Sequence, residues 1–164
     1  EILSGLVGSE MCIRDSIYIV HELACNITIY SYEEREGNPY FDRIQTVETT
    51  DSGKKDYGCS ASALTFSDDY HYLVASTAGE NTVAVYKADE ETGMLERLFC
   101  LPISGEYPKD AAIFPDNRHL VSLNHESNTM TFFSMDLKKK VLMMCAPALK
   151  VDRPNCIAFY RIQG

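Results

Sequence analysis

The chain has 164 residues, of which 45% are hydrophobic and 24% are charged, and its formal net charge is −9. An apolar share of this size can build a packed core, so composition excludes general disorder. The acidic balance argues against nucleic acid or an anionic membrane surface as a partner, and the lack of any stretch of about 18 apolar residues predicts no membrane-spanning helix.

The first sixteen residues differ in character from the rest of the chain. They lack the basic start and the apolar centre of a signal peptide, and they do not show the alternation of a strand. They resemble translated sequencing-adapter DNA, which contaminates some gene models. We therefore interpret residues 1–16 as a non-native leader; a native leader is the alternative.

From residue 17 onward, apolar and polar residues alternate over short segments that turn residues separate, and this pattern predicts β-strands. A polar stretch, 50–60, separates the first group of strands from the second. No segment of useful length has a helical period. The predicted strands are 17–20, 26–32 and 43–49 in the first group, 61–66, 72–76, 82–87 and 96–101 in the second, and 111–114, 119–123, 129–135 and 141–145 in the third.

The second and third groups repeat each other. Phe114 follows Phe66 by 48 positions, and Asn128 follows Asn81 by 47. A fixed period of this size, filled with short strands, is typical of a β-propeller, in which one period forms one blade. The sequence thus predicts about three four-stranded antiparallel blades, at 17–50, 61–101 and 109–146. Because propellers have roughly four to eight blades, it predicts a fragment of a ring.

The two ends of the repeat array complement each other. Residues 154–160 follow the pattern of 108–114, which is the first and innermost strand of a blade, whereas 17–20 match a second strand. In a closed ring, the final strand would complete a blade whose other strands lie near the N-terminus of the protein. We therefore expect 154–160 to be a closing strand.

Six cysteines are present, and no pair has Cys-x-x-Cys spacing; they are Cys12, Cys25, Cys59, Cys100, Cys145 and Cys156. Several lie in apolar strand segments, which predicts buried free thiols in a reducing cytosol and hence a cytoplasmic protein. No ligand set with metal-site spacing and no Gly-x-Ser-x-Gly, P-loop or dinucleotide motif occurs. We predict no metal and no cofactor.

Several short motifs occur in register with the predicted blades. They are Val-His-Glu-Leu at 20–23 before Asn-Ile-Thr-Ile-Tyr, Phe-Ser-Asp-Asp-Tyr-His-Tyr-Leu-Val at 66–74, Gly-Glu-Tyr-Pro-Lys-Asp at 105–110, Asn-His-Glu-Ser-Asn-Thr at 124–129, and Pro-Asn-Cys-Ile-Ala-Phe at 154–159. In this order they resemble the lactonase family of seven-bladed β-propellers, over residues 17–164. WD-repeat propellers fit less well, because the chain has no Trp. The resemblance implies the C-terminal part of a seven-bladed ring that needs roughly four N-terminal blades to close.

Lactone hydrolysis needs a base that activates water, and a positive group or hydrogen-bond donors that stabilise the developing oxyanion. The resemblance implies that Glu22 and Lys109 are the candidate catalytic residues, with His21, Tyr107, Asn124 and His125 as candidates for substrate binding. The chain departs from the family at two positions, where Ala78 and Lys109 stand in place of Arg. The alternatives are a solvated loop carboxylate for Glu22 and a surface lysine beside Asp110 for Lys109.

The implied function is a lactonase-type hydrolase that opens a sugar lactone such as 6-phosphogluconolactone in the pentose phosphate pathway. The alternative is a non-catalytic propeller that binds a metabolite or a protein partner, which the departures at 78 and 109 would allow. Because other blades would supply much of any pocket, we expect the 164-residue chain alone to be inactive.

Overall fold

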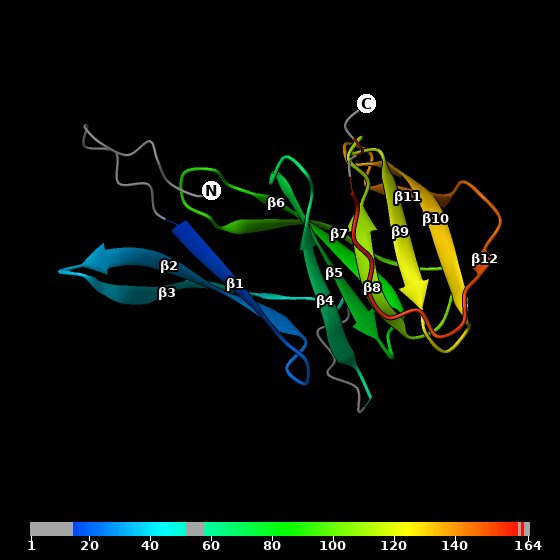
Figure 1. Cartoon of the computed structure of the whole chain (residues 1–164), viewed down its shortest axis with the longest axis horizontal. Helices are drawn as coiled ribbons and strands as arrows, with labels where there is room; N and C mark the ends of the chain where they lie inside the picture. Colours follow the sequence, from blue (N-terminus) through cyan, green and yellow to red (C-terminus); the bar gives the residue numbers. More distant parts are fainter. Residues whose placement is uncertain (1–14, 52–57, 161, 163–164) are drawn as a thin grey trace.

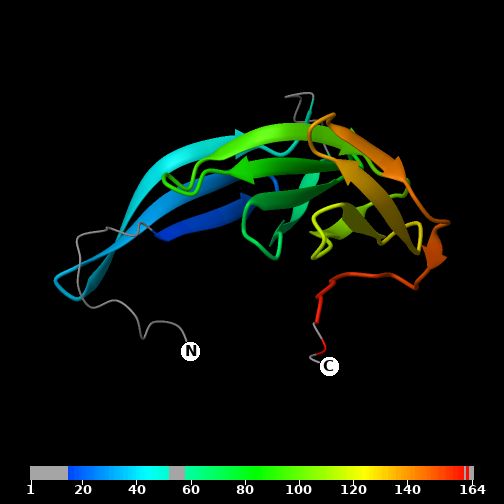
Figure 2. The same cartoon turned by 90° about the horizontal axis from the view of Figure 1, so that it is seen from above.

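A computed structural model describes residues 15–51, 58–160 and 162. The described residues form twelve β-strands and no helix, and the strands make three antiparallel sheets. Figure 2 shows the sheets side by side along an arc, with the chain after the third sheet returning on the concave side. The prediction of an all-β partial propeller is confirmed. Within these residues, no helix has the length and apolar character needed to cross a membrane.

The first sheet has the order β1 (Asp15–His21), β2 (Asn26–Arg35) and β3 (Asn38–Glu48). It starts two residues before the predicted boundary, because the first two residues of β1 pair with Tyr32 and Ser31. The rest of the predicted leader, 1–14, lies outside the described residues. Glu36 and Gly37 both have positive φ, as a two-residue hairpin turn requires, so β2 and β3 extend beyond the predicted strands.

The second and third sheets follow the predicted strands closely, with ends displaced by at most three residues. β12 was not predicted; it pairs with β10, the strand that also pairs with β9 and β11. The second sheet consists of β4 (Ser60–Phe66), β5 (Tyr72–Ala78), β6 (Thr82–Ala88) and β7 (Leu95–Pro102), and the third of β8 (Pro108–Ile113), β9 (His119–Asn124), β10 (Thr129–Asp136), β11 (Val141–Met144) and β12 (Leu149–Lys150).

Neighbouring sheets are joined by apolar side chains that lie between their faces. One cluster lies between the second and third sheets and includes Val85 and Leu120, which are fully buried. The other lies between the first and second sheets and includes Ile27 and Tyr86, also fully buried. The hydroxyl of Tyr86 in β6 donates a hydrogen bond to the main-chain oxygen of Glu48 in β3, at 2.6 Å. Each sheet thus buries its apolar surface mainly against a neighbouring sheet.

Residues 154–160 are not part of a described strand. The N–H of Ile157 donates to a carboxylate oxygen of Asp110 at 2.8 Å, and the ring of Phe159 lies 4.8 Å from that of Phe114, centroid to centroid. The segment therefore contacts the Asp110 side chain of β8 and the Phe114 ring, which directly follows β8. The innermost strand of a blade pairs with the second strand of the same blade. The described residues contain no second strand with which 154–160 could pair. The predicted closing strand therefore forms no β-ladder.

The cysteines are only partly buried, contrary to the expectation. Cys25 and Cys100 are buried and Cys59 is partly buried, but Cys145 and Cys156 are exposed. Cys145 follows β11, which is the edge strand of the third sheet. The short β12 pairs with β10 and not with β11. An apolar sequence around an edge strand therefore does not imply burial. Cys12 lies outside the described residues.

The Tyr86 hydrogen bond provides a test of the packing between the first two sheets. Tyr86→Phe removes a buried donor from the Glu48 carbonyl, and we expect it to lower the free energy of unfolding by about 1 kcal/mol. Urea unfolding followed by circular dichroism measures the change. Tyr70→Phe is the matched control, because the Tyr70 side chain is 73% exposed; equal losses for both variants would contradict the assignment.

The turn between β8 and β9 provides a test by pH. The N–H of Arg118 donates to the Asp116 carboxylate and, with smaller help from His119, holds the pKa of Asp116 below its ordinary value of 3.8, against an opposing effect of burial. Because the pKa of Asp116 is lower in the folded state than in the unfolded chain, its carboxylate stabilises the folded state at a pH above the ordinary pKa. This contribution is lost as the pH falls through the pKa of the folded state. We expect Asp116→Asn to lower Tm by roughly 2–4 °C at pH 7, with the difference closing below about pH 4.

The control for the Asp116 experiment is Asp152→Asn, which changes an exposed carboxylate outside this turn. Its Tm difference from the wild type should not vary between pH 7 and pH 3 in the same way. A difference for Asp116→Asn that is constant over this range would show that the charge of Asp116 does not contribute.

Candidate functional site

The ends of β1, β5 and β9 lie at the same end of the three sheets, at the lower side of Figure 1. The turns that follow these strands are 22–25, 79–81 and 125–128, and the innermost strands β4 and β8 begin at the same end. We call this end, made of residues 21–25, 77–81, 103–109 and 124–128, the candidate rim. All six predicted site residues lie on it.

Glu22 is exposed, and it is fixed against the start of the second sheet. One of its carboxylate oxygens accepts a hydrogen bond from the Ser60 hydroxyl at 3.0 Å, and its main-chain oxygen accepts one from the N–H of Ala61, also at 3.0 Å. The ring of His21 points back into the first sheet, where Nε2 lies 2.9 Å from the hydroxyl of Thr28. Glu22 is therefore held in place by its neighbours while its carboxylate stays open to solvent.

Tyr107 and Lys109 lie where the chain passes from the second sheet to the third. Tyr107 has a left-handed backbone (φ 58°), and its N–H donates to the side-chain oxygen of Asn81 at 2.8 Å. The Lys109 ammonium lies 4.9 Å from the centre of the Tyr107 ring, within the range of a cation–π interaction. Among the ion pairs of the described residues there is none between Lys109 and Asp110.

Asn124 is fully buried in the third sheet, and its amide is used within that sheet. Its oxygen accepts from the Ser122 hydroxyl at 2.9 Å, and its nitrogen donates to the hydroxyls of Thr129 at 3.2 Å and Thr131 at 3.0 Å. A Cβ on Gly105 would lie only 2.2 Å from the Asn124 nitrogen, so Gly105 leaves the space that this amide fills. This geometry gives Asn124 a role in holding the β9–β10 turn.

His125 follows Asn124 and connects the turn to Tyr107. Its main-chain N–H donates to the Tyr107 carbonyl at 3.0 Å. The ring nitrogen Nδ1 is buried and has no hydrogen-bond partner among the described residues. A buried polar atom without a partner is unusual in a folded protein. His125 therefore carries unused hydrogen-bonding capacity beside the Lys109–Tyr107 pair.

The predicted residues thus form two groups on one rim. His21 and Glu22 lie at the junction of the first and second sheets, and the other four lie at the junction of the second and third. Among the described residues, no hydrogen bond or ion pair joins Glu22 to Lys109. Ala78 is fully buried at the end of β5, and no basic side chain stands there.

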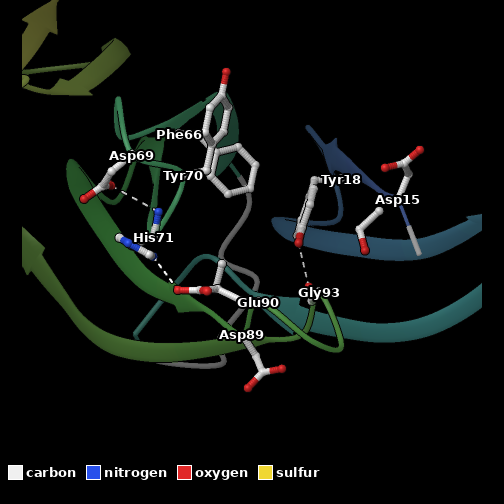
Figure 3. Close-up of a pocket in the computed structure, with 11 residues that line it drawn as sticks. Asp15, Tyr18, Phe66, Asp69, Tyr70, His71, Asp89, Glu90 and Gly93 are labelled. Carbon is white, nitrogen blue, oxygen red and sulfur yellow. Dashed lines mark hydrogen bonds and ion pairs between the residues drawn. The ribbon is translucent and has the colours of Figure 1, made fainter. Parts of the chain in front are cut away.

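A hollow that the sequence did not predict lies at the opposite end of the first and second sheets (Figure 3). It has a volume of about 570 Å³, and its walls carry four carboxylates and neither Lys nor Arg; the acidic residues are Asp15, Asp69, Asp89 and Glu90. The Tyr18 hydroxyl donates to the Gly93 carbonyl at 2.6 Å, and a ring nitrogen of His71 lies 2.9 Å from Glu90. Such walls repel anions, so the hollow does not suit a phosphorylated ligand.

Metal-ligating residues do not gather in the part of the chain that the structure describes. No group of three or more His, Cys, Asp or Glu side chains there could hold a metal ion. The chemistry available on the candidate rim is that of a fixed carboxylate, a lysine ammonium and an imidazole.

Proteins of known sequence and structure resemble this chain. A 6-phosphogluconolactonase of Bacillus subtilis strain 168 is 23% identical over 87% of the chain and 40% of its own length. An uncharacterized protein of Lactococcus lactis subsp. cremoris strain MG1363 is 30% identical over 73% of the chain and 34% of its own length. The chain therefore spans well under half the length of these relatives.

The fold is also similar to that of solved structures, and here too the chain covers less than half of the other protein. The periplasmic gluconolactonase PpgL of Pseudomonas aeruginosa superposes with a TM-score of 0.77 and 21% identity, over 90% of this chain and 40% of PpgL. The family model described as "Lactonase, 7-bladed beta-propeller" matches residues 13–159, which include every described strand from β1 to β12 and all six predicted site residues. The chain belongs to the family of seven-bladed β-propeller lactonases.

Proposed function

We propose that the protein is a lactonase-type hydrolase that opens a sugar lactone such as 6-phosphogluconolactone in the cytoplasm, with further blades completing the ring around the substrate. The observation that carries this proposal is the family match over residues 13–159. The relative from Bacillus subtilis, named as a 6-phosphogluconolactonase, supports the choice of substrate class. The protein would serve the pentose phosphate pathway in this role.

The proposed chemistry is the attack of water on the lactone carbonyl. The Glu22 carboxylate accepts a proton from the water as the new C–O bond forms, and the carbonyl oxygen gains negative charge. The bond between the carbonyl carbon and the ring oxygen then breaks, and the ring oxygen takes up the proton held by Glu22, which restores the Glu22 carboxylate and gives the hydroxy acid. The Ser60 hydrogen bond, which fixes one carboxylate oxygen, holds Glu22 in the orientation for this step.

The second group on the rim supplies the positive charge. Lys109, held over the Tyr107 ring, would pair with the carbonyl oxygen as it becomes negative, or with the carboxylate of the product. His125, with its unused ring nitrogen, would bind a sugar hydroxyl. His21 and Asn124 would act by holding their turns, because both are bonded within their own sheets.

The second candidate function is ligand binding without catalysis. It is favoured by Ala78, which is fully buried at a position where the family resemblance implies Arg, so that no planar donor group for an oxyanion stands there. A propeller of this kind would bind a sugar acid or a protein partner on the candidate rim. Binding of gluconolactone without acceleration of its hydrolysis would favour this candidate.

We expect Glu22→Gln to lower kcat for δ-gluconolactone opening by roughly a hundredfold or more, since it removes the general base and leaves the shape unchanged. The assay follows acid release with a pH indicator, against the spontaneous reaction, in a complete ring that contains these blades. The matched control is Glu126→Gln, which changes an exposed carboxylate on the same rim. Equal rates for the wild type and Glu22→Gln would exclude Glu22 from the mechanism, and the 164-residue chain alone should show no acceleration.

Asn124→Ala tests the structural role of the buried amide. The change leaves three hydroxyls without their amide partner, and we expect the free energy of unfolding to fall by about 2–3 kcal/mol. Urea unfolding measures the loss, with Asn155→Ala, at an exposed position, as the control. An unchanged stability together with weaker lactone binding would instead assign Asn124 to substrate recognition.

A further inference from the structure

The exposed apolar side chains of the strands gather at the two ends of the arc. Of the large apolar side chains that are exposed among the described residues, none lies in a strand of the second sheet. In the first sheet they are Ile17, Ile19, Tyr40 and Phe41, and in the third sheet and the segment after it they are Val141, Met143, Met144, Leu149, Phe159, Tyr160 and Ile162. The middle sheet has a neighbouring sheet on each face, whereas each end sheet has a neighbouring sheet on one face only (Figure 2).

The outer face of the first sheet has the pattern of a buried face. Successive residues of a strand point to opposite faces, and the residues of β1 next to Ile17 and Ile19 pack against the second sheet. A groove of about 300 Å³ lies on the outer face, lined by Ile17, Ile19, Tyr30 and Phe41. Ile17 pairs with Tyr30 across β1 and β2, just as Leu120 pairs with Phe133 across β9 and β10. Leu120 and Phe133 are buried between the second and third sheets, so the first sheet presents to solvent the positions that the third sheet buries.

The outer face of the third sheet has the complementary pattern. Phe132 pairs with Val121 across β10 and β9, just as Val85 pairs with Val74 across β6 and β5. Val74 and Val85 are buried between the second and third sheets. Phe132 and Val121 instead belong to a small apolar cluster that the segment after the third sheet joins through Ile157. The two outer faces are therefore the two halves of one more junction of the kind that joins the three sheets.

The strand edges at the two ends are complementary as well. The second strands β5 and β9 each pair with an innermost strand, β4 or β8, but β1 is the edge strand of its sheet. Residues 154–160 follow the sequence pattern of an innermost strand and lie beside β8, as β8 lies beside β4. One end of the arc thus has an innermost strand that lacks a second strand, and the other end has a second strand that lacks an innermost strand.

We propose that two copies of the 164-residue chain assemble head to tail into a closed six-bladed ring. Residues 154–160 of each copy pair with β1 of the other copy, and the outer faces of the first and third sheets pack against each other at both junctions. Three blades from each copy give six, within the range of roughly four to eight that propellers have. Two-fold symmetry joins both ends of both chains, so neither β1 edge stays free. The further blades of the complete ring proposed above would use the same surfaces, and here the second copy takes their place.

The repeat fixes the register of this pairing between copies. Ala111 of β8 pairs with Ser122 of β9. Ile157 holds the place of Ala111 in the sequence pattern, and Ile19 holds that of Ser122, because each lies two positions before the end of its strand. Ile157 of one copy therefore lies opposite Ile19 of the other. Directly opposite residues of an antiparallel pair have Cβ atoms about 4.5–5.5 Å apart, close to the separation that a disulfide spans.

The mass of the 164-residue chain in solution tests the ring directly. Size-exclusion chromatography with light scattering, in the presence of a reductant, should give twice the 18.5 kDa of one chain over roughly a hundredfold range of concentration. The mass of one chain over this range, or a series of larger masses from open head-to-tail filaments, would overturn the proposal. This measurement does not involve lactone hydrolysis, so its result is independent of the proposed function.

Ala158→Pro tests the strand pairing. The N–H of Phe114 donates to the His119 carbonyl, so every second residue of β8, Ala112 included, directs its N–H to β9. Ala158 holds the place of Ala112 and is exposed, so a proline there removes a donor that only the second copy uses. We expect the dimer to be lost, whereas Ala158→Ser, the matched control that keeps the N–H, should stay dimeric. Two variants with the same mass would contradict the pairing.

Ile17→Lys tests the packing of the faces. It places a charge on the outer face of the first sheet and should give the mass of one chain. Met94→Lys is the matched control, because its side chain is exposed to a similar extent, 41% against 38% for Ile17, but precedes β7 of the middle sheet. It should stay dimeric. A dimer of Ile17→Lys would show that this face is not part of the contact.

Cross-linking tests the register and is informative even where a variant weakens the dimer. Two chains, one with Ile19→Cys and the other with Ile157→Cys, are co-expressed in a background of Cys12→Ser, Cys145→Ser and Cys156→Ser. After oxidation with diamide, peptide mapping without reduction should give a disulfide between positions 19 and 157, in a species with the mass of two chains. Each variant expressed alone should give no such species. A mixture without this cross-link would overturn the proposed register.

Discussion

Face-to-face packing between neighbouring sheets is the constraint on which this structure depends. Each sheet is antiparallel and hydrogen-bonded within itself, but its apolar side chains are covered mainly by the next sheet. Polar contacts across the junction, such as the Tyr86–Glu48 hydrogen bond, fix the relative position of two sheets that the apolar contacts alone would leave free to slide. The curvature of the arc in Figure 2 follows from repeating this contact.

The alternation of residues and the 47- to 48-residue period were enough to predict the three sheets and most strand ends, because turn chemistry and side-chain pattern agree there. Among the features that were not predicted, two have a clear physical reason. Glu36-Gly37 is a weak hairpin signal, so the length of β2 and β3 was underestimated. The exposure of Cys145 depends on which strand lies at the edge of its sheet, and a local pattern of apolar residues does not carry that information.

For the candidate rim as well, the sequence named the residues but not the contacts that each side chain makes. Its six residues were named from the family resemblance, and they lie on one rim because the ends of β1 and β9 and the start of β8 are at the same end of the sheets. The use of each side chain could not be predicted: Asn124 is consumed by hydroxyls from its own sheet, whereas Lys109 is held over an aromatic ring. The acidic hollow in Figure 3 was not predicted, because its carboxylates come from two turns of the second sheet and from the start of β1, which are far apart in the sequence.

The contact between Gly105 and Asn124 has a consequence for how related sequences can vary. The amide occupies the volume that any larger residue at position 105 would need, so the two positions form one steric unit across a gap of 19 residues. A relative with alanine or serine at the position of Gly105 should carry a smaller side chain at that of Asn124, and the two substitutions should be inherited as a pair. Covariation between them would then report the geometry of the turn, independently of any pressure from the substrate.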